Sequence, residues 1–137
     1  MATLSDLQAQ RVVGADGRPG ELLYERIAQL AQGQWNRTGQ LGLVVGATFP
    51  AEIARVRELA PTLPLLIPGI GAQGGDAAAT VRAGWRSQSD ATGTHTTGPI
   101  MVSTSRAVLY ASGGDDFAVA ARRVAEATRQ QLNAARK

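Results

Sequence analysis

Cysteine is absent from this 137-residue sequence, which excludes disulfide bonds and thiolate chemistry. Aromatic residues make up only 4% of the chain, so the sequence offers no row of rings on which the bases of single-stranded nucleic acid could stack. Long apolar runs are also missing, and none approaches the roughly 20 residues that a membrane-spanning helix needs. We therefore expect no disulfide, no nucleic-acid partner and no membrane span.

Lysine is almost absent as well, because the only one is Lys137. Arginine carries the formal net charge of +3, and its residues are scattered, with small clusters at Arg55/Arg57 and Arg122/Arg123. This distribution is typical of a solvated protein surface and not of a nucleic-acid-binding face. Single arginines that bind one phosphate of a metabolite fit the pattern better.

The remaining composition is that of an ordinary globular protein. Hydrophobic residues make up 44% and charged residues 18% of the chain, which is long enough for one domain with a real core. We see no convincing linker, so we expect a single domain over residues 1–137. The N-terminal sequence MATLSDLQAQ lacks the charged-then-apolar pattern of a secretion signal, which predicts a cytoplasmic location.

The apolar pattern alternates between helical and strand-like segments. Leu41–Val45 is a short apolar run typical of a strand buried on both faces, and residues 65–67 and 100–103 predict two further strands. Helices are expected around residues 22–30, from Pro50 to about residue 59, over 77–84 with Asp76 as cap, and after Asp115 or Asp116 to the C-terminus. Residues 85–98 are polar and predict a loop.

Three successive strand–helix units predict an α/β protein with parallel strands and right-handed crossovers. Such a sheet needs cover on both faces, or closure into a barrel. The buried side of the last helix is expected to include Phe117, Ala120, Ala121, Val124 and Leu132.

The stretch PGIGAQGGD, residues 68–76, contains a G-x-G-x-x-G pattern between a strand and a helix. In a dinucleotide-binding fold, this pattern needs an acidic residue about 20 positions later, at the end of the next strand. Asp90 has nearly that spacing but lies in the polar segment QSDATGTHTTG. A dinucleotide-binding α/β domain is therefore the weaker alternative.

A single-phosphate site explains the same stretch in another way. The glycine loop follows one strand, and Ser105–Arg106 follows the next, so both lie where a (β/α)8 barrel binds phosphate in the loops after its last two strands. Backbone N–H groups, the Gln73 amide and the Arg106 guanidinium would supply the hydrogen bonds. Together these residues favour a phosphate site over a tight turn beside a solvated arginine.

Three sequence blocks resemble one family. LGLVVGAT followed by P-x-E, then LPLLIPGIGAQGGD, then MVSTSRAVLYAS are similar to the C-terminal half of orotidine 5′-phosphate decarboxylase, in its longer bacterial (type 2) form. The resemblance covers nearly the whole chain. It implies the C-terminal part of a TIM (β/α)8 barrel, with about three parallel strand–helix units.

The resemblance also implies site residues. Gln73 and Arg106 would bind the substrate phosphate, helped by backbone groups near Gly71, Gly74 and Ser105. The substrate pocket would include Pro68, beside the pyrimidine, and Thr48, which would lie with Val45 at or near the barrel mouth. The implied ligand is a small nucleotide, orotidine monophosphate (OMP) or its product uridine monophosphate (UMP).

The family converts OMP to UMP and CO2 in pyrimidine biosynthesis, without a metal or an organic cofactor. Its proton donor is a lysine within a D-x-K-x-x-D motif, and this chain has no such motif. At 137 residues it has about half of the roughly 250 residues of a typical barrel, so the first four strands would lie outside it. The fifth would be absent or reduced to its trailing loop LSDLQAQRV. We therefore expect a lyase by resemblance, with no catalytic residue of its own and no activity without the missing half.

Three explanations stay open: a piece of a split or processed enzyme, a truncated chain, or a non-catalytic nucleotide-phosphate-binding half barrel. Because a half barrel exposes unpaired strand edges, we expect association with another copy or with a complementary N-terminal half.

Other polar and aromatic residues have ordinary explanations. His95 is expected in a solvent-exposed loop and not in a metal or general-base site. Asp115 and Asp116 fit helix capping better than a pair of catalytic carboxylates, and Trp35 and Trp85 are expected to pack at the ends of segments.

Overall fold

The computed structural model describes residues 9–14, 16–17, 19–89 and 92–136. Residues 4–8 of the predicted trailing loop, most of the N-terminal sequence tested for a secretion signal, Asp90 and Lys137 lie outside this part of the chain. The described elements are, in chain order, β1 (Arg11–Val13), β2 (Pro19–Leu22), α2 (Leu23–Gln32), β3 (Leu43–Val44), α3 (Pro50–Leu59), β4 (Leu65–Pro68), α4 (Ala77–Gly84), β5 (Arg86–Ser89), β6 (His95–Gly98), β7 (Ile100–Ser103), α5 (Arg106–Leu109) and α6 (Phe117–Ala134).

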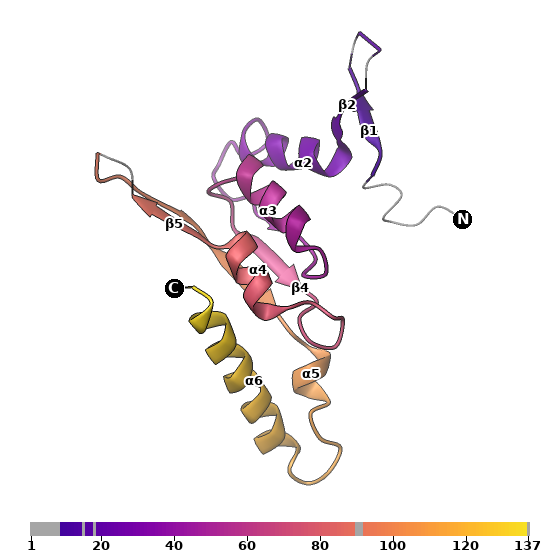
Figure 1. Cartoon of the computed structure of the whole chain (residues 1–137), viewed down its shortest axis with the longest axis vertical. Helices are drawn as coiled ribbons and strands as arrows, with labels where there is room; N and C mark the ends of the chain where they lie inside the picture. Colours follow the sequence, from indigo (N-terminus) through magenta and orange to yellow (C-terminus); the bar gives the residue numbers. More distant parts are fainter. Residues whose placement is uncertain (1–8, 15, 18, 90–91, 137) are drawn as a thin grey trace.

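A three-stranded parallel sheet forms the centre of the molecule, with strand order β3-β4-β7 (Figure 1). Strand β4 therefore lies in the middle of the sheet, and the three parallel strands have the same order in the sheet as in the chain. The α/β class and the parallel strands predicted from sequence are confirmed. Two antiparallel pairs, β1–β2 and β5–β6, lie outside this sheet.

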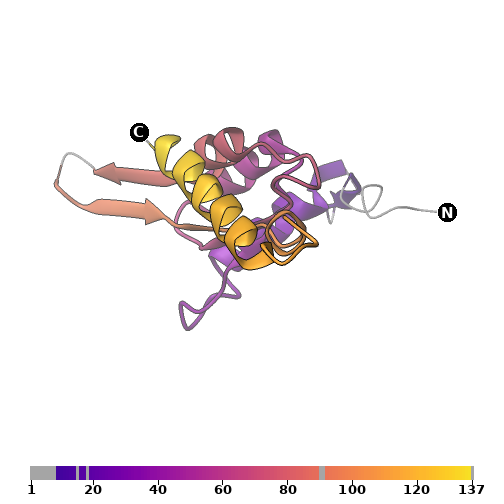
Figure 2. The ribbon, with the colours of Figure 1, turned by 90° about the horizontal axis from the view of Figure 1, so that it is seen from below.

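The helices cover one face of the parallel sheet. Helix α2 packs on α3, α3 on α4 and α4 on α6, and this layer lies in front of the strands in Figure 1. In Figure 2, which is seen from below, α6 runs obliquely across the front of the molecule. Leu65 and Ile67 of β4 point into the layer and are fully buried, in a core with Ile53 and Val56 of α3.

The opposite face of the sheet carries a row of exposed apolar side chains. Val44, Leu66 and Met101 lie side by side in register across the three strands. Their exposed fractions are 70%, 37% and 58%. The expectation that the first strand is buried on both faces is therefore wrong, because no described element covers this face and β3 is an edge strand of the described sheet.

The predicted helix ends are mostly correct. Pro50 occupies the first turn of α3, and Asp76 caps α4 by accepting a 2.6 Å hydrogen bond from the Ala79 N–H. Asp116 precedes α6 as predicted, but its carboxylate accepts a hydrogen bond from the Ser112 hydroxyl and does not cap the helix.

The segment predicted as a loop over residues 85–98 is instead an antiparallel pair of strands, β5 and β6, with Arg86 opposite Gly98 and Ser87 opposite Thr97. In Figure 1 the pair projects to the upper left, whereas β4 points to the lower right. It therefore extends from the amino ends of β4 and β7. His95 belongs to strand β6 and not to a loop.

A buried arginine ties this amino end together. The Arg57 side chain is 0% exposed and donates hydrogen bonds to the carbonyl oxygens of Gly84, Ala60, Pro61, Leu63 and Pro99, at 2.6–3.3 Å. Burial, together with the charge of Arg86, lowers the pKa of Arg57 to about 10. The guanidinium is thus still charged at neutral pH. The surface location predicted for the Arg55/Arg57 cluster is correct for Arg55 and wrong for Arg57.

Several aromatic and apolar residues differ from expectation. Trp35 is 56% exposed and Phe117 is 63% exposed, so neither is a packing residue. Trp85 is half-buried and lies under the Arg136 guanidinium, 4.3 Å from the ring centre, which holds the end of α6 beside α4. Ala120 is the residue of α6 that is fully buried. Among the described residues, no helix is long and apolar enough to cross a membrane.

Candidate functional site

The glycine loop forms a tight turn directly after β4. Gly71 and Gly74 have φ values of 78° and 87°, a region that residues with a side chain rarely adopt. The Gly74 N–H donates to the Gly71 carbonyl oxygen at 2.8 Å, and the Gly71 N–H donates to the Gly75 carbonyl oxygen at 3.3 Å. These two glycines therefore fix the shape of the loop with N–H groups that are already engaged.

Contacts on both sides hold this loop at the carboxyl ends of the strands. The Thr104 hydroxyl, just beyond β7, donates to the Ile70 carbonyl oxygen at 3.2 Å. On the other side, the Ala47 N–H donates to the Pro68 carbonyl oxygen at 2.8 Å. The loops after β3, β4 and β7 thus meet at one edge of the sheet.

A small pocket of about 80 Å³ opens between the glycine loop and the start of α5. Its lining includes Pro68, Gln73, Ser105 and Arg106, four of the seven residues predicted for the site. Gln73 and Arg106 are both exposed, as a site open to a ligand requires. The two residues are 33 positions apart in the sequence, and the parallel register of β4 and β7 brings them together.

The other three predicted residues, Gly71, Gly74 and Thr48, do not line this pocket. Thr48 follows β3 at the same end of the sheet, and it is exposed. Ala72 and Thr104 line the pocket although neither was predicted. Their only signal in the sequence was that they are next to the predicted residues Gln73 and Ser105.

The pocket is continuous with the uncovered face of the sheet. Pro68 and Ser103 are paired in the parallel register and follow Leu66 and Met101 by two residues, so they point to the same face. A ligand anchored in the pocket can therefore extend its remaining part over the exposed face. This is the arrangement that an anionic group joined to a flat ring needs.

Several proteins that share one name are similar in sequence to this chain. A protein from Variovorax paradoxus named orotidine 5′-phosphate decarboxylase is 64% identical over 132 residues, and one of the same name from Leptothrix cholodnii is 68% identical over 131 residues. The chain is similar to part of orotidine 5′-phosphate decarboxylase. Each match covers 96% of this chain and 44% of the relative, so the chain spans less than half of the curated relatives' length.

Solved structures agree with the decarboxylase similarity. An OMP decarboxylase from Leishmania donovani superposes with a TM-score of 0.65 at 39% identity, over 94% of this chain and 44% of that one. A UMP synthase from the same organism gives 0.67 at 41% identity, over 93% of this chain and 25% of that one. No protein-family model matches the chain. The resemblance predicted from the three sequence blocks is confirmed.

A second, larger cavity was not predicted. It has a volume of about 380 Å³ and lies between α2, β3 and the start of α3. Its walls are mainly apolar and include Leu23, Tyr24 and Ile27 of α2 and Leu43 and Val44 of β3. This cavity lies along the free edge of β3, away from the smaller pocket beside the glycine loop.

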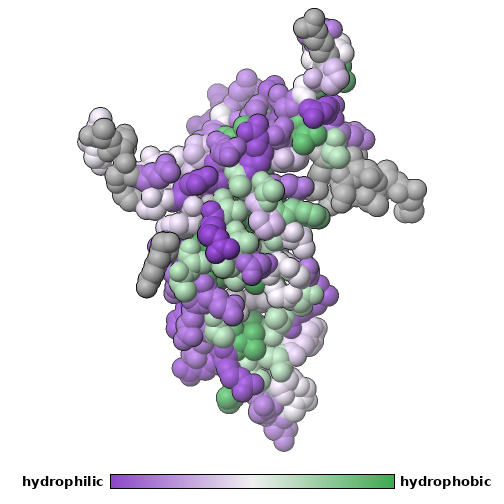
Figure 3. All heavy atoms as spheres, in the orientation of Figure 1, coloured by the Kyte–Doolittle hydropathy of each residue, from purple (hydrophilic) through white to green (hydrophobic). Residues whose placement is uncertain are grey.

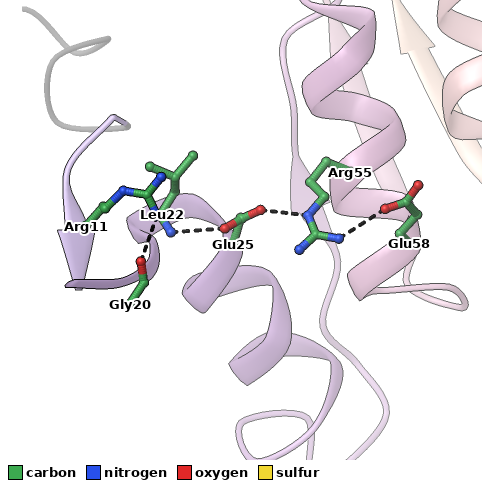
Figure 4. Close-up of polar contacts among 6 residues, drawn as sticks. All are labelled: Arg11, Gly20, Leu22, Glu25, Arg55 and Glu58. Atoms are coloured by element: carbon green, nitrogen blue, oxygen red, sulfur yellow. Dashed lines mark hydrogen bonds and ion pairs between the residues drawn. The ribbon is translucent and has the colours of Figure 1, made fainter. Parts of the chain in front are cut away.

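An ion-pair network holds α2 in place beside that cavity (Figure 4). The Glu25 carboxylate accepts hydrogen bonds from Arg55 at 2.6 Å and from the Leu22 N–H at 3.0 Å. Arg55 also contacts Glu58 at 3.1 Å. The Arg55 hydrogen bond, followed by that of the Leu22 N–H, lowers the pKa of Glu25, and burial raises the pKa of the adjacent Tyr24.

Within the described residues, no group of three or more histidine, cysteine, aspartate or glutamate side chains could hold a metal ion.

Proposed function

We propose that the chain is the phosphate-binding part of an orotidine 5′-phosphate decarboxylase. In this proposal, β3, β4 and β7 with their helices are the C-terminal strand–helix units of a TIM barrel, and the ligand is OMP or UMP. The observation that carries the proposal is the shared pocket of Gln73 and Arg106 at the carboxyl ends of adjacent parallel strands. Phosphate contacts in the loops after the last two strands are typical of this barrel.

The chemistry of the pocket suits a phosphate monoester. The Arg106 guanidinium can donate two parallel hydrogen bonds to phosphate oxygens, and the Gln73 amide can donate another. Ser105 and the part of the loop between Gly71 and Gly74 would add backbone donors nearby, whereas the N–H groups of these two glycines are engaged within the loop. Pro68 provides an apolar contact for the pyrimidine where the pocket joins the exposed sheet face.

Decarboxylation leaves a carbanion-like centre, which a cation must stabilise and a proton donor must protonate. We propose that both groups come from outside this chain, since its sequence has no D-x-K-x-x-D motif. The chain then acts as a lyase only together with residues that complete the barrel. We further propose that it works in the cytoplasm, in line with a cysteine-free sequence.

The absence of the D-x-K-x-x-D motif also favours a second function, a non-catalytic module that binds nucleotide phosphate. The dinucleotide alternative has less support, because a dinucleotide site lies where the strand order of a sheet reverses. The described parallel strands are instead ordered as in the chain, β3-β4-β7.

Calorimetric titration with UMP, uridine and NAD tests the proposal. UMP should bind the chain, whereas uridine and NAD should bind far more weakly or not at all. Removing one charged phosphate contact costs about 1.5–3 kcal/mol, so Arg106→Ala should weaken UMP binding about 10- to 150-fold. Arg82→Ala, an exposed arginine on α4 outside the pocket, is the matched control. Equal affinity of Arg106→Ala and Arg82→Ala for UMP would refute the phosphate role.

A further inference from the structure

Strand β3 has one side of its backbone free for pairing. The N–H groups of Leu43, Val45 and Ala47 donate to carbonyl oxygens on the β4 side, at 2.8–3.0 Å. Successive residues of a strand present their N–H and C=O groups to opposite sides, so those of Val44 and Gly46 face away from β4. An edge of this kind is a template for an added strand.

The 380 Å³ cavity lies along this edge. Val44 and Gly46 line it, and its other walls come from α2 and α3. Ile27, on the α2 wall, is 39% exposed even though it lies on an amphipathic helix beside the core. A cavity with a strand edge on one side and apolar helix residues above it has the form that an additional strand of the same sheet would fill.

The uncovered sheet face points to the same conclusion. Parallel sheets are normally buried on both faces, yet Val44, Leu66 and Met101 form an exposed apolar row across all three parallel strands. The row lies on the side away from the helix layer, so it is not on the face shown in Figure 3, where hydrophilic side chains surround a central apolar band. A partner that extends the sheet past β3 can curve over this row.

We propose that the β3 edge, the adjacent cavity and this apolar row form one docking surface, and that its occupant is a chain carrying the part of the decarboxylase relatives that this chain does not match. The occupant adds a strand parallel to β3 in the cavity and covers the row with apolar side chains. This inference rests on the proposed function. It is supported by the relatives themselves, which extend over more than twice the matched length.

A second copy of this chain fits the surface less well. A two-fold axis would place the two β3 edges antiparallel, whereas the central sheet is parallel throughout. Each copy would also offer only the two-residue strand Leu43–Val44 to the other. Self-association is therefore the competing outcome that the experiment must separate.

The test is co-expression of this chain with the unmatched portion of the Variovorax paradoxus relative, followed by sedimentation to measure mass. We expect a 1:1 complex. Val44→Asp should weaken it at least about tenfold, because a carboxylate would be buried in the apolar interface. The matched control is Val119→Asp on α6, since Val119 is 72% exposed and Val44 is 70% exposed.

Val44→Pro provides an independent variant. It removes the Val44 N–H, which faces away from β4, so the pairing of β3 with β4 is kept. A strand docked on the free edge would lose one hydrogen bond, because its carbonyl oxygen would no longer have this donor. Circular dichroism of each variant alone checks folding. Equal complex formation by Val44→Asp, Val44→Pro and Val119→Asp would overturn the proposal, as would a homodimer that excludes the relative's portion.

Ligand binding separates this proposal from the proposed function. Arg106→Ala should form the complex normally although it binds UMP weakly. A chain that binds UMP but forms no complex would contradict the docking surface alone. A complex that forms as expected, with no UMP binding, would contradict the phosphate site alone.

Discussion

Arg57 offers the sharpest stability prediction, because one side chain connects four segments of the fold. Its guanidinium donates to carbonyl oxygens at the ends of α3 and α4 and just before β4 and β7. The bonds to Gly84, Ala60 and Leu63 are fully buried, so water cannot replace the lost donor there. We expect Arg57→Met to leave these three acceptors unsatisfied.

The expected magnitude follows from those three acceptors. Each buried carbonyl left without a donor costs about 1–3 kcal/mol, giving about 3–9 kcal/mol in all. Part of this loss is offset, because the substitution also removes a buried charge and with it the free-energy cost of desolvating that charge. We expect a net loss of about 3–5 kcal/mol in the free energy of unfolding. This is a large share of the roughly 5–15 kcal/mol of a typical domain.

Thermal unfolding followed by circular dichroism, with urea unfolding as a second measure, tests this value. Arg57→Met should melt at least about 10 °C below the wild type, and Arg57→Lys should be intermediate, since one ammonium cannot reach the same set of acceptors. The control Arg82→Met changes an exposed arginine and should stay within about 0.5 kcal/mol. If Arg57→Met unfolds at the same temperature as Arg82→Met, the hydrogen bonds of Arg57 to backbone carbonyl oxygens do not stabilise the fold.

Three further predictions concern individual contacts. Asp76→Ala should lower the free energy of unfolding by about 1 kcal/mol in urea titrations, because α4 loses its cap. Gly84→Ala should cost about 1–3 kcal/mol in the same assay, since the new Cβ would lie 3.0 Å from Ile67 Cδ1 in the core. Glu25 has a lowered pKa in the folded state, so its bond to Arg55 stabilises the fold above the ordinary pKa of 4.5 and is lost as the pH falls through the folded pKa. Glu25→Gln should therefore be less stable than wild type at pH 7, and the difference should shrink below pH 4.5; a difference independent of pH would contradict the ion pair.

Much of the fold could be predicted from local patterns. The helical spacing of Ile53 and Val56, the proline at the start of α3 and the Asp76 cap each act within one turn, so the sequence displays them directly. The β5–β6 pair was not predicted because its residues are polar on both faces. Backbone hydrogen bonds hold the two strands together, so their sequence does not show the alternation of apolar and polar residues by which a strand is recognised. The exposure of Val44 was not predicted for a different reason. An apolar run indicates a strand, but it does not show whether other elements cover both faces of that strand.

The candidate site was partly visible. Gln73 and Arg106 could be linked because parallel strands end at one edge of a sheet, and the structure places them around one pocket. Arg57 was missed because its residue type is typical of surfaces. Its position gave a signal, since it follows Ile53 by four residues and precedes Ala60 by three, which puts it on the buried side of α3. No sequence pattern predicted the cavity beside β3, because the cavity depends on how α2, β3 and α3 are placed relative to one another.

A structure of the chain with UMP bound would test the central claim most directly. The phosphate is expected in the pocket after β4 and β7, with oxygens within about 3 Å of the Arg106 guanidinium and the Gln73 amide, and with the uracil ring beside Pro68. UMP bound elsewhere, or in that pocket with its phosphate away from both side chains, would contradict the account.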